Sequence, residues 1–320
     1  MARGHLRPRS AWLPPRASSL TFDDGVIELR IGSNEHKELF CRTFVESHRA
    51  YDPKDWPWPE LDDLSLARLR AIPIWTMALE VEQDAGVMLE GYAKTEDDPI
   101  VREALALQGY EEARHGRILQ CMIDRYGLKV TPESKGKEPT RDAFIGFGYD
   151  ECVDSFAGFG IFRLARDARI LPESLTSLFS RVLVEEARHI VFFVNWVAWD
   201  RTRRGLRGPL MQAIPALLCY GSAVTRRVKG GSEMAGSAPK NEQPEDMRID
   251  LFGEVLSGLT PTAFLRACVE ENDRYMAAFD QRLLRPRVIP TLGKFALAIL
   301  ETIDRIRAFP KSAPPSPSSG

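Results

Sequence analysis

The residues Glu-Glu-Ala-Arg-His stand at 111–115, and the same five residues return at 185–189. Chance repetition of a pentapeptide is improbable in a chain of 320 residues. In each copy a glutamate precedes a histidine by three positions: Glu112 and His115, then Glu186 and His189. Residues three apart on an α-helix share one face, so each copy can present a carboxylate and an imidazole to one metal ion.

Both copies interrupt a stripe of apolar residues at helical spacing. The first stripe is Val101, Leu105, Gln108, Glu112, His115, Leu119 and Met122. The second is Phe179, Val182, Glu186, His189, Phe193 and Trp196. Such stripes face a core, where a carboxylate or imidazole needs a partner. Two interruptions on two helices predict a shared metal site; the alternative is an old duplication that has lost its metal.

The surrounding sequence predicts an all-α fold. We expect four long helices at 66–95, about 99–126, about 140–168 and about 172–203, followed by helices at 207–228, 261–285 and 288–307. Asp98-Pro99 is an N-cap followed by proline, and Gly127 is a helix stop. Pro73 either kinks the first helix or marks its true start. A strand signal is confined to 19–31, where an Asp-Gly turn would close a hairpin.

These elements divide the chain into five segments. We expect a disordered basic tail at 1–22, an N-terminal extension at 23–65, a four-helix bundle at 66–205, accessory helices packing on it at 206–308, and a disordered tail at 309–320.

Composition narrows the function classes. The 43 Lys and Arg against 45 Asp and Glu give a net charge of −2, which excludes a globally basic nucleic-acid binder. The five cysteines are too far apart for CxxC metal sites and argue against a disulfide scaffold. No apolar run reaches 18 residues, so we expect no spanning helix and a cytoplasmic protein.

Two further carboxylates are expected from the helices that precede each copy. In an antiparallel pair, residues at one height lie equally far from the turn. Glu82 and the glutamate of the first copy have their midpoint at Asp97, inside the expected turn, although Glu80 satisfies this test nearly as well. Before the second copy the candidates are Glu151 and Asp154, and the midpoint mildly prefers Asp154.

Residues 66–203 resemble the ferritin-like di-iron carboxylate superfamily, which includes rubrerythrins, ribonucleotide reductase small subunits and bacterial multicomponent monooxygenase hydroxylases. Acid-Glu-x-Arg-His resembles the motif of the hydroxylases. Glu82-Gln-Asp-Ala, followed by Gly-Tyr-Ala, is similar to the first helix of rubrerythrin and selects Glu82. Glu151-x-x-Asp154 is similar to the paired acids of its third helix, which implies Glu151 as the main ligand and Asp154 as an extra one.

The resemblance implies a ferritin-like bundle that holds two iron ions. One ion would be bound by Glu82, Glu112 and His115, and the other by Glu151, Glu186 and His189. Glu112 and Glu186 would bridge the ions and so act in catalysis. Glu111 and Glu185 resemble acids that bond the far nitrogen of a ligand histidine. Arg114 and Arg188 would neutralise these acids or, alternatively, lie on a solvated helix face.

Four carboxylates and two imidazoles form a hard donor set suited to Fe/Fe or Mn/Fe, and four negative charges balance two Fe(II) ions. We therefore expect a non-haem di-iron oxidase or oxygenase that uses O2 on a small or medium organic substrate. A reductase or ferredoxin would supply electrons, because the sequence contains no flavin, haem or iron–sulfur motif. The alternatives are rubrerythrin-like peroxide scavenging or iron handling, and a metal-free helical interaction protein.

The third long helix combines phenylalanines with glycines. Phe156, Phe159 and Phe162 recur at every third position, and glycines such as Gly158 are costly inside a helix. We expect an apolar substrate pocket beside the metals; the alternative is tight packing with aromatic fill.

The C-terminal third has no catalytic motif. Seven cations and no acid lie between Asp200 and Glu233, around the apolar run Pro209 to Val224. This run could contact a membrane surface or a partner protein. The helix expected at 261–285 has one broad apolar face, which could pack on the bundle or form a homodimer.

Overall fold

The computed structural model describes residues 29–72, 74–133, 136–206, 208–236 and 260–308. Over these residues the regular structure is entirely helical, which confirms the all-α class. The elements are α1 (Asn34–Glu46), the short 3₁₀ helix η1 (Pro53–Asp55), α2 (Asp63–Ala71), α3 (Trp75–Ala93), α4 (Pro99–Tyr126), α5 (Arg141–Asp167), α6 (Glu173–Arg203), α7 (Pro209–Gly236), α9 (Pro261–Met276) and α10 (Val288–Ala308).

The long helices begin and end where their capping residues predict. Asp98 accepts the backbone N–H of Val101 at the start of α4, and Thr140 caps α5 in the same way. Gly127 ends α4 with a φ of 59°, a left-handed conformation that favours glycine.

The prediction of a single helix at 66–95 is wrong. The chain instead forms α2 and α3, with a break after Ala71. Ile72 has an extended backbone because the proline that follows it disfavours the helical conformation. The sequence allowed this proline either to kink the first helix or to mark its true start. The start of α3 at Trp75 agrees better with the second interpretation.

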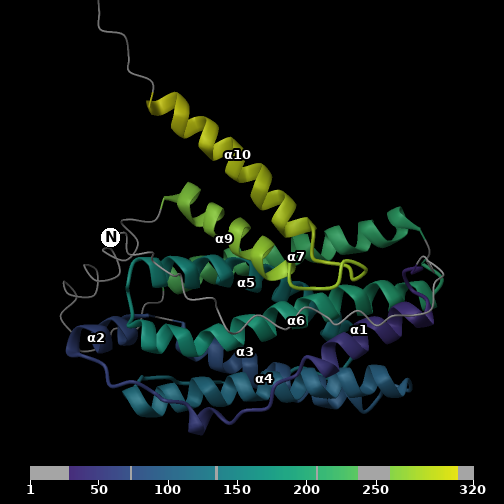
Figure 1. The fold of residues 1–320 in the computed structure, drawn as a ribbon, viewed down its shortest axis with the longest axis horizontal. Coiled ribbons are helices and arrows are strands. Elements are labelled where there is room, and N and C mark those ends of the chain that lie inside the picture. Colours follow the sequence, from purple (N-terminus) through teal and green to yellow (C-terminus); the bar gives the residue numbers. More distant parts are fainter. Residues whose placement is uncertain (1–28, 73, 134–135, 207, 237–259, 309–320) are drawn as a thin grey trace, which may run out of the picture.

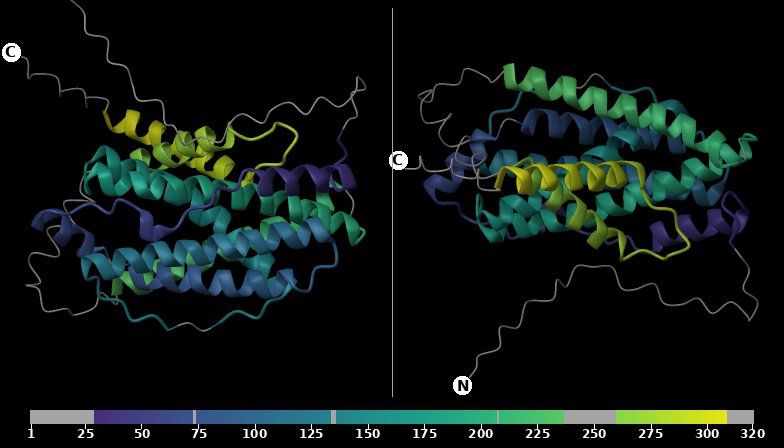
Figure 2. Two further views of the ribbon diagram at one scale, coloured as in Figure 1. Left: turned by 60° about the horizontal axis from the view of Figure 1, so that its bottom comes forward. Right: turned by 90° about the horizontal axis from the view of Figure 1, so that it is seen from above.

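Helices α3, α4, α5 and α6 run side by side around a shared core (Figure 1, Figure 2). Gly86 brings α3 close to α4, since a Cβ there would lie 3.0 Å from Ala113. Gly148 brings α5 against α6, since a Cβ there would lie 2.1 Å from the ring of Phe193. These approaches bring the middles of the four helices together, where both pentapeptides lie.

The N-terminal extension contains a helix that the sequence did not predict. Ser33 caps α1, and α1 packs against both α4 and α6. Its Phe40 and Phe44 are buried in the main core. Helix α1 therefore belongs to the structure that surrounds the two pentapeptides.

The C-terminal helices cover the other side, with α7 and α9 packed on α5, and α10 packed along α9. The apolar face of α9 thus packs on the long helices, as one of the two alternatives predicts. Helix α9 ends at Met276, earlier than expected, and α7 extends to Gly236. The hairpin expected at 19–31 and the tails at 1–22 and 309–320 lie wholly or largely outside the described residues. None of the helices searched, all within the described residues, is long and apolar enough to cross a membrane.

Candidate metal centre

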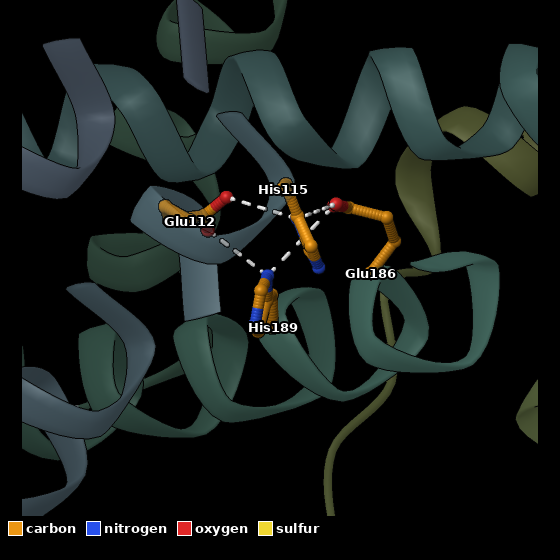
Figure 3. Close-up of side chains that lie close together, drawn as sticks. All are labelled: Glu112, His115, Glu186 and His189. Atoms are coloured by element: carbon orange, nitrogen blue, oxygen red, sulfur yellow. Dashed lines mark ion pairs between the residues drawn. The ribbon is translucent and has the colours of Figure 1, made fainter. Parts of the chain in front are cut away.

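The two pentapeptides face each other across α4 and α6 (Figure 3). One ligand atom each from Glu112, His115, Glu186 and His189 lies within 4.8 Å of the other three. The contacts cross between the helices: His115 Nδ1 is 3.0 Å from a Glu186 oxygen, and His189 Nδ1 is 2.9 Å from a Glu112 oxygen. Each imidazole therefore meets the carboxylate of the opposite copy.

Two further glutamates join this group. An oxygen of Glu82 lies 3.5 Å from His115 Nδ1. Glu151 is buried beside Glu186, and its Oε2 has no hydrogen-bond partner. Glu80, the positional alternative to Glu82, instead accepts the backbone N–H of Glu133 on an exposed part of the molecule. Glu82, Glu112, His115, Glu151, Glu186 and His189 are called the Glu/His cluster below.

Asp154 does not join the Glu/His cluster. Both of its carboxylate oxygens accept hydrogen bonds from the guanidinium of Arg227 on α7, one of them at 2.6 Å. The role of extra ligand that we expected for Asp154 is therefore dropped. The midpoint rule preferred Asp154, whereas the structure places Glu151 beside Glu186 and turns Asp154 to Arg227.

Glu111 and Glu185, called the outer acids below, lie one position before the cluster glutamates. Glu185 accepts a hydrogen bond from Nε2 of His115 at 2.8 Å, and Glu111 accepts one from Nε2 of His189 at 2.9 Å. A carboxylate accepts only, so each Nε2 carries the proton. In the neutral form of each ring Nδ1 then carries the lone pair, and both Nδ1 atoms are buried without a hydrogen-bond partner. This is the arrangement that a ligand histidine requires.

The two arginines of the repeat are buried and do not lie on a solvated face. Arg114 donates to Glu185 at 2.8 Å, and Arg188 donates to Glu111 at 3.0 Å. Their side chains are 0% and 3% exposed. Each arginine thus neutralises the outer acid of the opposite copy.

The segment after α1 completes this outer layer, and sequence analysis missed it. His48 Nδ1 lies 2.6 Å from Glu111, and the Tyr51 hydroxyl donates to Glu185 at 3.0 Å. Ser47 accepts from the Arg188 guanidinium at 2.8 Å. The one available signal was the scarcity of histidine, since the chain has only five.

The pKa directions describe a strongly coupled group of charges. Burial raises the pKa of Glu82 to about 8, against the opposing effect of His115. Burial and the neighbouring carboxylates raise the pKa of Glu151 well above its usual range. Burial alone would lower the pKa of both cluster histidines, but the surrounding carboxylates raise it well above the ordinary value. The carboxylates thus strongly favour positive charge at their centre.

The charges of the outer acids and of the Glu/His cluster can be counted separately, and the count shows where positive charge is needed. The outer acids carry two negative charges, and the two buried arginines balance them. The four cluster glutamates carry up to four more, with no arginine or lysine paired to them among the contacts of the described residues. Buried charge of this size requires counter-charge. Protons on Glu82, Glu151 and the two imidazoles supply it here, as their raised pKa values indicate, and two divalent cations would supply it if they were bound.

The three phenylalanines of α5 each pack on a different neighbour. The ring of Phe159 stacks on Tyr275 at 4.4 Å between centroids, and Phe162 lies against Phe179 at 6.0 Å. Phe156 lies against Gly293, where a Cβ would be 2.7 Å from its ring. Gly158 has no atom within 4 Å of a would-be Cβ. These contacts are those of aromatic packing, the alternative to a substrate pocket.

We compared the chain with family models, curated proteins and solved structures. No family model, no curated protein and no solved structure matches the chain. The function is therefore inferred from the geometry of the Glu/His cluster.

Proposed function

We propose that the Glu/His cluster is a di-iron centre of the ferritin-like type, and that the protein is an O2-dependent oxidase or oxygenase. One observation carries this proposal. Two buried imidazoles turn Nδ1 atoms that make no hydrogen bond toward the carboxylates of Glu82, Glu112 and Glu186, while their Nε2 atoms are bonded to separate acids.

The donor set favours iron over other common cations. Four carboxylates and two imidazoles mix hard oxygen with nitrogen donors, as iron and manganese prefer, whereas calcium and magnesium take oxygen alone. Two bound iron ions would supply the electrons and the Lewis acidity for reduction of O2. The four carboxylates of the centre would match the charge of two Fe(II) ions.

The residues around the cluster prepare it for that chemistry. The outer acids hold the proton on Nε2 of each imidazole and so fix the ring orientation. Arg114 and Arg188 place a buried guanidinium against each of these acids. Glu112, His115 and His189 are at most 1% exposed, which limits the access of water to the bound ions. The protein thus supplies orientation, charge balance and exclusion of water.

Peroxide reduction or iron handling is the second candidate, and one observation favours it. Phe156, Phe159 and Phe162, which we expected to line a substrate pocket, are engaged in packing against α6, α9 and α10. A centre that reduces peroxide or stores electrons needs no organic substrate beside it. Both candidate functions use the same metals. They differ in whether an organic substrate is oxidised.

Anaerobic loading with Fe(II) tests both. We expect two iron ions per chain by elemental analysis, with Mössbauer spectra of a coupled pair after exposure to O2. Protein loaded with redox-inactive Zn(II) is the matched control and should consume no O2. Rapid O2 consumption with an oxidised organic product supports the oxygenase, and faster reaction with peroxide supports the second candidate. Failure to bind two ions would contradict both.

A further inference from the structure

Helix α10 carries a stripe of large apolar side chains that no described residue covers. Leu292, Phe295, Ile299, Ile303 and Ile306 are each between 37% and 68% exposed. At 3.6 residues per turn, the five fall within an arc of about 80° along the helix. Figure 1 shows α10 beside α9 on the outside of the molecule, with both inclined to α6.

The stripe faces away from α9 because polar contacts fix the opposite side of α10. Three pairs tie the two helices together along their length: Lys294 with Asp273 at 2.8 Å, Glu301 with Arg266 at 3.0 Å, and Asp304 with Thr262 at 2.6 Å. The polar members on α10 lie more than about 100° around the helix from Ile299. Helix α10 therefore turns these polar groups, together with Ile289 and Leu297, toward its own chain and the stripe outward.

The spacing of the stripe is the same in both directions. Counted from Leu292, the steps are three, four, four and three residues. Two antiparallel copies of α10 centred on Ile299 would place equal heights together: Leu292 with Ile306, Phe295 with Ile303, and Ile299 with itself. An interface around a twofold axis requires this kind of self-complementarity.

We propose that α10 is a dimerisation helix that pairs antiparallel with α10 of a second copy of this chain. The residues beside the stripe allow this pairing, since Ala296 would lie opposite Thr302, and Thr291 opposite Arg307. No like charges meet there. A narrow apolar seam with small or polar flanks is the pattern of paired helices.

A lipid surface fits the same stripe less well. Helices that lie on membranes present a wide apolar face and a basic polar face. The polar side of α10 carries both signs: Lys294 and Arg305 are basic, and Glu301 and Asp304 are acidic. All four contact α9 or each other. A membrane also gives no reason for a mirror-symmetric spacing.

Measurement of the mass in solution is the first test. We expect the protein to show twice the chain mass of 36.0 kDa by light scattering at micromolar concentration. Ile299→Glu places two carboxylates face to face on the axis and should halve that mass. Leu218→Glu is the matched control, because Leu218 is 70% exposed on α7 and lies outside the stripe. It should leave the mass unchanged, and circular dichroism should show both variants to be folded.

Cysteine cross-linking tests the antiparallel direction. A mixture of Leu292→Cys and Ile306→Cys chains should form mixed disulfides on mild oxidation, above the background of the unsubstituted protein. Leu292→Cys alone should not cross-link, because in the antiparallel pair the two copies of that position are about 21 Å apart along the helix.

Each contrary outcome overturns the proposal. These outcomes are a monomer at 50 to 100 micromolar, dissociation by Leu218→Glu but not by Ile299→Glu, and self-cross-linking of Leu292→Cys. A monomer that floats with phosphatidylglycerol vesicles through Ile299 would instead assign the stripe to a lipid surface.

Discussion

Replacement of Glu185 by glutamine tests whether the outer acids orient the histidines. The change keeps the size of the side chain and removes its charge. Glu185 accepts hydrogen bonds from Nε2 of His115, from Arg114 and from the Tyr51 hydroxyl, at 2.8, 2.8 and 3.0 Å. A glutamine has one acceptor oxygen and presents an NH2 group to the remaining donors. The imidazole of His115 therefore loses its strong acceptor.

The expected loss is specific to one of the two metal positions. Loss of such a partner typically costs 10- to 100-fold in metal affinity, or about 1.4 to 2.7 kcal/mol. The position held by His189 depends on Glu111 instead and should change little. In the metal-free variant, the Arg114 guanidinium also loses its carboxylate partner at position 185. It keeps two other contacts, the carbonyl of Arg49 at 3.0 Å and Glu111 at 3.5 Å. We expect a stability loss of about 2 to 3 kcal/mol, below that of a fully unpaired buried charge.

Anaerobic titration with Co(II), followed by its absorption, measures the two positions. Glu185→Gln should give one unchanged and one weakened binding step. Tyr51→Phe is the matched control, because it removes only the third hydrogen bond to Glu185 and should change affinity less than about threefold. Two unchanged steps, or two equally weakened ones, would refute the argument that each outer acid serves the opposite histidine.

Three further predictions follow from single contacts. Glu151→Gln should weaken one metal position, whereas Asp154→Asn, one turn later, should leave two metals bound by elemental analysis. Gly148→Ala should destabilise the protein by about 1 to 3 kcal/mol in urea, because its methyl group would overlap a phenylalanine ring of α6. Asp98→Ala should cost about 1 kcal/mol at neutral pH through loss of the α4 cap. Although partial burial raises the pKa of Asp98, Lys37 and backbone N–H groups lower it overall; the contribution is therefore present above pH 3.8 and lost as the pH falls through the native pKa.

The sequence predicted what local periodicity controls. Glu112 and His115 share a face because they are three residues apart, and the cap at Asp98 starts α4 whatever packs against it. The contact between Asp154 and Arg227 joins residues 73 positions apart, and the bond from Tyr51 to Glu185 spans 134 positions. No periodic pattern encodes such pairs, so α1, the outer hydrogen bonds and the exclusion of Asp154 emerged only from the structure.

The outer layer would make the two proposed metal positions unequal. The repeat places the same five residues on α4 and α6, and their crossed hydrogen bonds are nearly symmetric. The segment after α1 breaks this symmetry, because Glu111 receives an imidazole from His48 whereas Glu185 receives a phenol from Tyr51. Glu111 also lies against both buried arginines, 3.0 Å from Arg188 and 3.5 Å from Arg114, whereas Glu185 accepts from Arg114 and from a phenol whose pKa burial raises. His189 therefore bonds to a more neutralised acid than His115 does, and it would be the weaker electron donor of the two histidines if metal were bound.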